Sequence, residues 1–368
     1  MALALYRKYR PQTFEELVGQ DAVKKILTNS LKQGHIAHAY LFAGPRGVGK
    51  TSAARLFAYA LNNVAPGDTA GAGLDIVEID AASNRGIDDV KALRDEIRTG
   101  PAHLPWKVFI LDEAHMFTKE AFNALLKSLE EPPAHTVFIL ATTEPHKIIP
   151  TIQSRCVRLD FHQLSIADMV ARLEQLAKKE GVEVEEKGLK AIAINSKGGM
   201  RDAETLLGKV LSLGKPKITF DDVRDTLRLI DDHLIIRLVE LLTKAVAKGS
   251  STTDTSESMS THSPESLAPA LEYINGLTHK GVDMQQFLKS LVEYVRKLAL
   301  VNTSESLTTI IADELTKEEL GVMVKQSKAF TNTQLLVLLK VVMQALEDVD
   351  RYPLPHMALE VAVMGWER

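Results

Sequence analysis

The strongest chemical signal in this sequence is a glycine-rich stretch between residues 44 and 51. It consists of Gly44, Pro45, Arg46, Gly47, Val48, Gly49, Lys50 and Thr51. This is a complete G-x-x-x-x-G-K-T phosphate-binding loop, in which glycines allow backbone N–H groups to converge on phosphate oxygens. Lys50 would bridge the β- and γ-phosphates, and the Thr51 hydroxyl would bind Mg²⁺. Because an apolar run precedes the loop and a helix-forming stretch follows it, we predict that the chain binds a nucleoside triphosphate.

Two consecutive carboxylates, Asp112 and Glu113, follow the apolar run Val108–Leu111. If this run is a strand of the sheet that carries the phosphate loop, its carboxyl end lies at the ligand-binding edge. Asp112 would then hold Mg²⁺, directly or through water, and Glu113 would polarise the attacking water. A hydrophobic run that ends in Asp-Glu can also be a plain strand entering a polar loop, but the shared sheet favours the magnesium interpretation.

Three further residues could contact the phosphates. Thr143 follows the next predicted strand, where a hydroxyl can contact both the attacking water and the γ-phosphate, although threonine is common at strand ends. Arg155 precedes a strand and Arg201 opens a helix. An arginine at the γ-phosphate stabilises charge in the transition state. From the residues alone, a surface ion pair worth under about 1 kcal/mol is the favoured interpretation of each arginine.

Strand-length apolar runs, mostly separated by helical patterns, could bring these residues together. The runs are Ala39–Ala43, Leu74–Ile79, Lys107–Leu111, Thr136–Ala141 and Val157–Phe161. Strands that alternate with helices predict a parallel sheet covered on both faces. A helix is predicted over Asp21–Gln33, and another is expected to begin after a Thr118 cap and to end before Pro132.

From about Ser165 onward the hydrophobic periodicity is helical throughout. The predicted helices of this part are Asp168–Lys179, Glu186–Ser196, Arg201–Ser212, Phe220–Arg228, Leu267–His279, Met284–Asn302, Lys317–Lys328, Thr331–Glu347 and one after Pro353 and Pro355. Residues 249–266 are rich in serine and threonine, so we expect a disordered insertion there. The predicted domains are 1–162, 163–229 and 230–368.

Composition sets limits on the class of protein. The 368 residues include 45% hydrophobic and 25% charged residues, as in ordinary globular proteins with two or three domains. The formal net charge of −4 means that any nucleic-acid contact requires a local basic face. A single cysteine, Cys156, excludes an internal disulfide and a cysteine-built zinc site and fits a reducing compartment. We expect no signal peptide and no membrane span, and therefore a cytoplasmic protein.

The motifs beyond the phosphate loop are similar to those of one family. They are Tyr6–Phe14, Val18–Gln20, His38–Phe42, Glu78–Ser83, Asp112–Met116, Phe122–Lys127, Leu129–Pro133 and Ser154–Cys156. In these residues the chain resembles the bacterial DNA polymerase III gamma/tau subunits, the AAA+ ATPases of the sliding-clamp loader. The resemblance is strong over about residues 3–212 and weaker to the end. It implies an α/β fold class: an AAA+ P-loop parallel five-stranded sheet with helices on both faces, a small helical lid domain and an all-α collar domain.

The resemblance also implies roles for individual residues. Arg155 becomes an arginine finger that acts on ATP held by the neighbouring subunit, and Arg201 a sensor that contacts ATP in its own subunit. Thr143 falls at the sensor position of the fourth strand. Arg10, Pro11 and Val18 resemble the adenine pocket wall. The implied cofactors are ATP and Mg²⁺. The implied partners are other clamp-loader subunits in a hetero-oligomeric ring with further copies of this chain, the sliding clamp, primer–template DNA and the DNA-directed DNA polymerase holoenzyme.

Two departures from the family pattern stand out. Members usually carry a four-cysteine zinc module after the first helix of the sheet domain, but here residues 62–73 contain no cysteine and Asn63 occupies the first ligand position. We therefore expect no thiolate zinc site. The chain also ends soon after the predicted collar, which is typical of the short, gamma-like form.

Several alternatives stay open from the sequence. The chain could be a scaffold that uses ATP mainly as an assembly switch, or another DNA-linked AAA+ motor. Basic residues at 85, 91, 94 and 98, with Asn84, could face DNA or form a solvated helix face with the acidic residues between them. The eleven histidines lack a convincing metal-ligand spacing, so they are interpreted as ordinary surface or packed residues. Cys156 is interpreted as a buried small hydrophobe.

Overall fold

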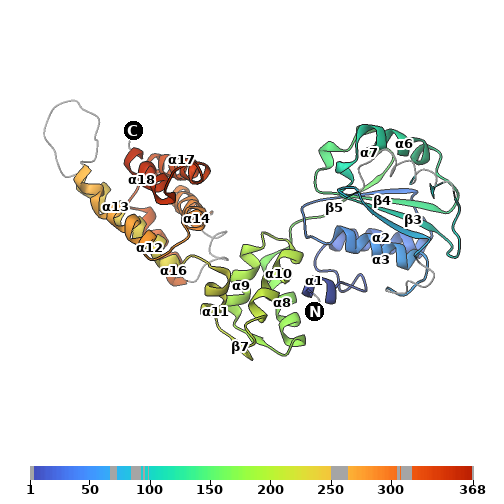
Figure 1. Ribbon diagram of the computed structural model, residues 1–368, viewed down its shortest axis with the longest axis horizontal. Coiled ribbons are helices and arrows are strands. Elements are labelled where there is room, and N and C mark those ends of the chain that lie inside the picture. The colour runs from blue at the N-terminus through green and yellow to red at the C-terminus, as the bar shows by residue number, and fades with distance from the viewer. Residues whose placement is uncertain are drawn as a thin grey trace. The chain divides into compact units, whose positions relative to one another are not determined.

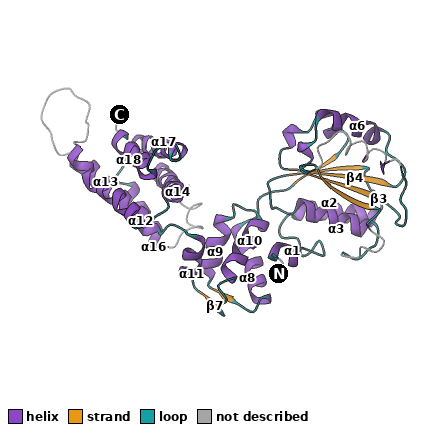
Figure 2. Cartoon of the chain, in the orientation of Figure 1, coloured by secondary structure: helices purple, strands orange, loops and turns teal. Residues whose placement is uncertain are grey.

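The structure is a computed structural model that describes residues 4–66, 73–83, 93, 96, 97, 99–249, 264–304, 307 and 317–366. The chain divides into two compact units, Met1–Leu227 and Arg228–Arg368, which are called the first unit and the second unit below. Figure 2 shows the large sheet within the first unit, whereas the second unit is helical.

A five-stranded sheet forms the centre of the first unit (Figure 1). Its strands are β1 (Ala39–Ala43), β2 (Ile76–Asp80), β3 (Lys107–Asp112), β4 (Thr136–Thr142) and β5 (Val157–Asp160). They lie in the order β2-β3-β4-β1-β5, and every neighbouring pair is parallel. The predicted five-stranded parallel sheet is therefore confirmed, with strand ends within two residues of the predicted ones.

Helices cover both faces of this sheet, as the unbroken apolar runs of β1, β3 and β4 predict. Tyr40 and Phe42 of β1 pack with α2 (Asp21–Gln33) and α3 (Lys50–Leu61), while Leu41 packs on the other face. That other face is covered by α6 (Lys119–Glu130) and α7 (Pro150–Gln153), whose buried residues include Phe122, Leu125 and Ile152. The alternation follows from the two-residue period of side chains along a strand.

The cap of α6 is the predicted one. The Thr118 hydroxyl accepts a hydrogen bond from the Ala121 backbone N–H at 3.2 Å, which satisfies one of the donors left free at a helix start. The helix ends at Glu130, ahead of Pro132 and Pro133. Between β3 and α6 lies a short 3₁₀ helix, η1 (Ala114–Met116), and between β4 and α7 lies another, η2 (Pro145–Lys147).

The remainder of the first unit is a small helical bundle. It contains α8 (Ile166–Lys179), α9 (Glu186–Asn195), α10 (Met200–Leu211) and α11 (Phe220–Leu227) around a shared apolar core. The expectation that this part is helical throughout was incomplete. Strands β6 (Glu183–Val184) and β7 (Lys217–Ile218) form a parallel two-stranded pair. Strands of two residues are too short for a hydrophobic period to reveal them.

The N-terminal residues form a helical turn that was not predicted from the sequence. Leu5–Lys8 form a helical turn, α1. Arg172 of α8 donates a hydrogen bond to the Tyr9 carbonyl at 3.1 Å, and Lys8 pairs with Glu180 at 2.7 Å. Leu5 and Tyr9 also pack against the apolar core of the bundle. This segment is therefore held by contacts with residues more than 160 positions away in the chain. A local sequence pattern cannot predict such contacts.

The second unit is built from α12 (Asp232–Gly249), α13 (Pro264–His279), α14 (Met284–Thr303), α16 (Lys317–Ser327), α17 (Asn332–Asp348) and α18 (Pro355–Gly365). Their apolar faces share one core, which includes Phe287, Leu338 and Trp366. The Trp366 indole N–H donates to the Gln334 carbonyl at 3.1 Å, so this buried ring keeps its polar end paired. The predicted helices are found at this end of the chain.

Several expectations lie outside the described residues. Residues 250–263 of the predicted insertion are among them, whereas Gly249 and Pro264–Ser266 belong to α12 and α13. The candidate DNA-contacting residues 84, 85, 91, 94 and 98 are also outside. In the described chain no single helix is long and apolar enough to cross a membrane, although α16 from Glu319 and α17, bent by 109°, pass that test as a pair by length and composition alone.

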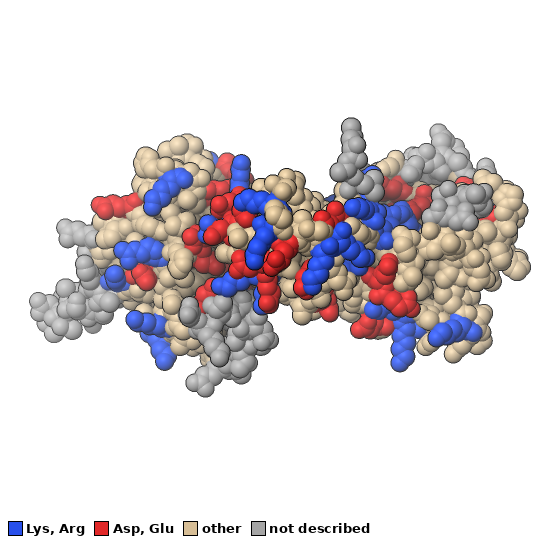
Figure 3. Space-filling view, turned by 90° about the horizontal axis from the view of Figure 1, so that it is seen from below, with Lys and Arg blue, Asp and Glu red and all other residues tan. Residues whose placement is uncertain are grey.

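Charged side chains of both signs are interspersed over the face seen in Figure 3. Many of the ion pairs among the described residues join side chains three or four positions apart on one helix, such as Lys178 with Glu174 and Lys190 with Glu186. Pairs of this kind on exposed helix faces each contribute only about 0.3–0.5 kcal/mol. Among the described residues, pairs of this kind let acidic and basic side chains lie together on exposed helix faces, and they indicate no single ligand.

Candidate nucleotide site

The phosphate loop joins β1 to α3 at the carboxyl edge of the sheet. Gly44 has φ +152°, and a Cβ there would lie 2.2 Å from the Phe161 carbonyl oxygen, so no other residue fits. Gly47 has φ +78°, a region that L-residues rarely adopt, and a Cβ there would meet the Gly199 Cα at 3.2 Å. The loop backbone therefore runs close to β5 on one side and to the start of α10 on the other.

Backbone donors at the start of α3 have no protein partner. Within the described residues, the N–H groups from Gly47 to Ser52 donate to no backbone or side-chain acceptor, and the Gly49 cap makes no side-chain bond. Helix starts of this kind, with the positive end of the helix dipole, are ready-made anion sites. Val48 is buried in the sheet core and anchors the loop, while Pro45 and Arg46 are exposed.

Lys50 has its side chain turned back into the loop. It is only 6% exposed, and its ammonium donates to the Gly44 and Pro45 carbonyls at 2.7 Å each. Burial lowers the pKa of Lys50, and the nearby carboxylates of Glu113 and Asp112 oppose that shift. A buried cation beside unpaired N–H groups is a strong electrostatic attractor for phosphate.

Thr51 and Asp112 meet across the sheet. The Thr51 hydroxyl donates to Asp112 Oδ2 at 2.8 Å, although β4 lies between the strands that precede these residues. The other carboxylate oxygen, Oδ1, accepts from the Glu113 backbone N–H at 3.0 Å. A hydroxyl and a carboxylate in contact beside a phosphate loop supply the hard oxygen ligands that Mg²⁺ prefers, so the residues present fit this ion.

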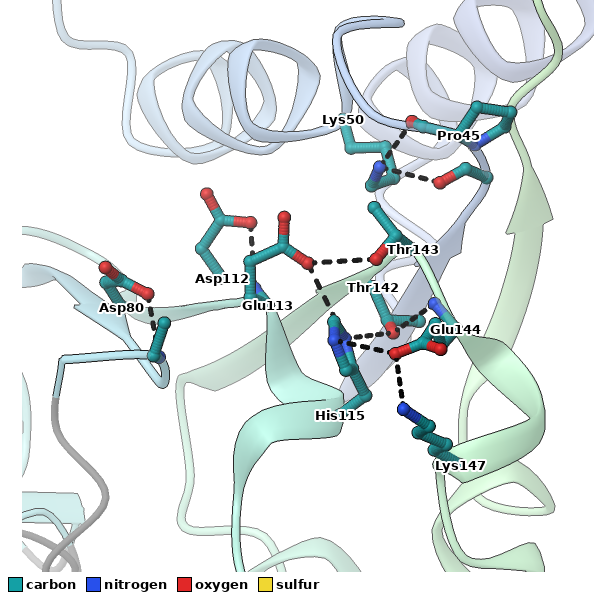
Figure 4. Close-up of polar contacts among 12 residues, drawn as sticks. Pro45, Lys50, Asp80, Asp112, Glu113, His115, Thr142, Thr143, Glu144 and Lys147 are labelled. Atoms are coloured by element: carbon teal, nitrogen blue, oxygen red, sulfur yellow. Dashed lines mark hydrogen bonds and ion pairs between the residues drawn. The ribbon is translucent and has the colours of Figure 1, made fainter. Parts of the chain in front are cut away.

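Glu113 lies directly beyond β3 with φ 47° and ψ 43°, an unusual left-handed conformation for a residue with a long side chain. Its Oε2 atom accepts a hydrogen bond from the Thr143 hydroxyl at 3.3 Å, as Figure 4 shows. The structure thus brings together Lys50, Thr51, Asp112, Glu113 and Thr143, which the sequence placed at a common edge.

One contributor to this edge was missed. His115 of η1 was grouped with the ordinary histidines, yet its side chain is only 7% exposed and contacts Thr142, Glu113 and Glu144. Its position three residues after Asp112 gave no signal by itself, because the contacts depend on β4 lying beside β3.

Arg155 lies away from this cluster, at the surface. Its guanidinium donates to the Glu130 carboxylate at 2.7 Å and to the Thr151 carbonyl at 2.6 Å. The side chain remains 34% exposed, so another molecule could reach it. Cys156, the next residue, is half-buried against the α6–α7 side of the sheet, and burial raises the pKa of its thiol to about 12. This thiol is therefore a poor nucleophile.

Arg201 adjoins the loop through its backbone, whose N–H donates to the Gly47 carbonyl at 3.4 Å. Its guanidinium lies over the Tyr6 ring, 4.8 Å from the centroid. A hydrogen bond from Arg201 is the main reason that the pKa of the Tyr6 hydroxyl is lowered. The sequence did not predict this partner from the N-terminal segment.

The expected adenine-pocket residues lie in the stretch of chain between α1 and α2. Val18 is half-buried against the bundle core, and Arg10 and Pro11 are half-buried between α1 and α2 in the chain. Leu17, beside Val18, limits the space at Gly49, where a Cβ would approach it at 2.8 Å. The role of Arg10, Pro11 and Val18 stays a prediction.

Fold and site together define a class of protein. A phosphate loop after β1, an acidic pair after β3 and a polar residue after β4, in a β2-β3-β4-β1-β5 sheet followed by a helical bundle, are the features of AAA+ proteins. The RuvB Holliday junction branch migration motor of Thermotoga maritima has this fold, with a TM-score of 0.51 and 23% identity over 64% of this chain and 80% of that chain.

Sequence relatives are more specific. A family model for the DNA polymerase III delta subunit matches residues 19–165, and one for domain III of the gamma and tau subunits matches residues 264–365. The tau subunit of Bacillus subtilis is 38% identical over 98% of this chain and 62% of its own length. The gamma subunit of Buchnera aphidicola is 40% identical over 65% of this chain and 69% of its own. The chain belongs to the family of DNA polymerase III gamma and tau subunits.

Proposed function

We propose that this chain is an ATPase subunit of the DNA polymerase III clamp loader. ATP binding and hydrolysis would drive opening of the sliding clamp and its loading onto primed DNA. Family membership supports this proposal, and so does one geometric observation: the Thr51 hydroxyl contacts Asp112 at 2.8 Å beside the buried Lys50. The chain spans 62% of the B. subtilis tau subunit, so the activity of the whole assembly is part of the proposal.

In the proposed reaction the loop binds the triphosphate through its free N–H groups and Lys50. Thr51 and Asp112 would hold Mg²⁺, which when bound supplies positive charge that neutralises the phosphate oxygens. Glu113 would accept a proton from the attacking water, and Thr143 would hold Glu113 while sensing the γ-phosphate. Arg10, Pro11 and Val18 would line the adenine pocket.

Two arginines would complete the site. Arg155, which is exposed at the surface, would act on ATP held by the adjoining subunit, and Arg201 would reach ATP within its own subunit. The guanidinium of Arg201 lies over the Tyr6 ring, and its backbone N–H is bonded to Gly47 of the loop, so this side chain begins beside the proposed phosphate site. An arginine supplied by a neighbour stabilises transition-state charge and would make hydrolysis depend on assembly.

The domain division 1–162, 163–229 and 230–368 belongs to this proposal as nucleotide-binding domain, lid and collar. The apolar core of the second unit supports a packing role for it. The proposed partners are further copies of this chain and other clamp-loader subunits, the sliding clamp, primer–template DNA and the polymerase holoenzyme, in the cytoplasm.

The test is phosphate release by the chain assembled with its partner subunits, sliding clamp and primed DNA. We expect stimulated turnover in the wild type. Glu113→Gln should retain ATP binding, measured separately with a fluorescent ATP analogue, but lose about 10²–10⁴-fold in turnover, the usual contribution of a general base. Normal stimulated hydrolysis by Glu113→Gln would remove this residue from the mechanism. A wild type that binds ATP without turnover would favour the scaffold alternative.

A further inference from the structure

The imidazole of His115 is buried between the ends of two neighbouring strands, next to the proposed catalytic carboxylate (Figure 4). It belongs to η1, which follows Glu113, and it faces residues 142–144 at the end of β4. A buried polar ring is costly unless its nitrogens are paired, and both nitrogens of this ring have partners.

The two ring nitrogens of His115 contact different residues. Nδ1 lies 3.0 Å from the Thr142 hydroxyl and 3.5 Å from Glu113 Oε2. Nε2 lies 3.2 Å from Glu144 Oε2. That same oxygen accepts from the Lys147 ammonium at 2.8 Å, and this bond is the main reason that the pKa of Glu144 is lowered. Glu144 is thereby kept as an anion that can orient the imidazole.

Glu113 is held on one side only. Its Oε2 contacts Thr143, the residue directly after β4, and His115 from η1, whereas Oε1 accepts no hydrogen bond from any described residue. A glutamate side chain loses up to about 2 kcal/mol of rotamer entropy when it is fixed, so a single weak contact of 3.3 Å would fix it poorly. A second contact, at 3.5 Å from a buried ring, adds to the first, and the two together restrict the direction in which Oε1 can point.

We propose that His115 is a positioning residue for Glu113: with an N–H on both nitrogens, the ring donates to Glu144 through Nε2 and faces Glu113 Oε2 through Nδ1, so that Oε1 is presented to the attacking water. Glu144 and Lys147 act one step further out, because they orient the ring through Nε2. This inference rests on the proposed ATPase function. It adds a residue that touches no phosphate-loop group and acts only through Glu113.

Two conservative variants separate the two sides of the ring. The amide of Asn can reach the Nδ1 position and the amide of Gln the Nε2 position. We therefore expect His115→Ala to lower kcat of stimulated ATP hydrolysis roughly 10- to 100-fold, since a misplacement of about 1 Å costs about that much. His115→Asn should recover most of this loss, and His115→Gln should not. Affinity for a fluorescent ATP analogue should stay within about twofold in all three, because the interaction matters only in the transition state.

Controls distinguish the possible failures. His146→Ala alters an exposed histidine on η2 and should leave kcat unchanged. Thermal unfolding of each variant shows whether the fold survives, and the Asn and Gln pair is compared only at equal stability. If the wild type does not hydrolyse ATP, the proposed function fails first. If Glu113→Gln hydrolyses normally, Glu113 is removed from the mechanism and the positioning role of His115 is overturned with it, while the ATPase function stands. If Glu113→Gln is inactive while His115→Ala is fully active, or while Asn and Gln behave alike, the positioning role is overturned and the proposed function stands.

Discussion

The two units of this chain bury very different kinds of side chain. Among the described residues, every buried charged side chain lies in the first unit; these are Lys50, Asp75, Lys107, Arg172 and Glu204. In the second unit the fully buried polar residues of the described chain are Gln326 and Ser327, and the buried residues of its shared core are apolar. One unit therefore carries internal charge, and the other is a conventional helical core.

The first unit tolerates buried charges because hydrogen-bonding groups of the backbone surround them. Asp75 accepts three backbone N–H bonds from residues 102–104, and these outweigh the effect of burial, so that the pKa of Asp75 is lowered. Among the described residues, Lys50 has hydrogen bonds to carbonyls of its own loop and to no carboxylate. Because burial of charge is costly without a strong partner, an incompletely paired lysine indicates a ligand site. The second unit gives no such indication.

The largest expected effect is on ATP turnover, and it concerns Arg155, which we propose acts on the site of an adjoining subunit. Arg155→Ala should reduce ATP turnover of the assembled complex by about 10³–10⁵-fold, the range for an arginine supplied by a neighbour. Turnover by the isolated chain should not change. Arg158→Ala is the matched control, since Arg158 is an exposed arginine nearby that pairs with Asp160. Equal loss in the isolated chain and in the complex would show that Arg155 does not act in trans.

A second prediction tests whether the apolar unit serves packing alone. Phe287 is fully buried in the second unit, so Phe287→Ala should lower the free energy of unfolding by about 3–5 kcal/mol. Affinity for ATP, a property of the first unit, should not change. Denaturant unfolding followed by circular dichroism, with ATP-analogue binding, measures both quantities. Phe57→Ala, in α3 behind the phosphate loop, should instead lose both. Loss of nucleotide binding in Phe287→Ala at native temperature would contradict this separation.

The third prediction concerns internal charge in the helical bundle of the first unit. Burial raises the pKa of Glu204 from 4.5 to about 7, and Arg172 opposes the shift. The folded state therefore binds a proton that the unfolded state releases. The stabilising contribution of this proton is fully present below pH 4.5 and is lost as the pH rises through about 7. Glu204→Gln should remove this pH dependence and stabilise the protein at pH 8 by up to roughly 3 kcal/mol.

Unfolding free energies between pH 5 and pH 8 test this linkage, with the wild type compared at each pH. Glu174→Gln is the control, because Glu174 is an exposed glutamate on α8 paired with Lys178. If Glu204→Gln keeps the same difference in stability from the wild type at every pH in this range, Glu204 is not the group responsible.

The smallest predicted effect is the loss of unfolding free energy when a helix-capping threonine is removed, and it should be similar in the two units. Thr118 and Thr331 each accept a hydrogen bond from the backbone N–H three residues later, at 3.2 Å. Thr118→Ala and Thr331→Ala should each cost about 1 kcal/mol of unfolding free energy, as lost helix caps do. The cap is a local device, so its value should not depend on whether the surrounding core contains charge. A difference well above 1 kcal/mol between the two variants would show that it does.

Local patterns predicted the parts of this protein that residues close in sequence determine. The phosphate loop, the apolar strands, the Thr118 cap and the helices of the second unit follow from glycine freedom, strand and helix periods and capping chemistry. The shared edge of Lys50, Asp112 and Thr143 was also predictable, because parallel strands all end at one edge of a sheet.

Other features depended on neighbours that are distant in the chain. Tyr6 meets Arg201, and Lys8 pairs with Glu180, only because the bundle folds back onto the N-terminal segment. The β6–β7 pair joins residues more than 30 positions apart. His115 acquires its contacts because β4, rather than another strand, lies beside β3.

The sequence by itself determined that a triphosphate loop and an acidic pair are present and that they belong to one sheet. Each motif consists of a few consecutive residues, and each follows an apolar run of strand length. Only the tertiary structure decided which side chains hold those groups in place. The order of the strands and the docking of the N-terminal segment set those contacts, and both result from the burial of apolar surface over the whole unit rather than from any short stretch of chain.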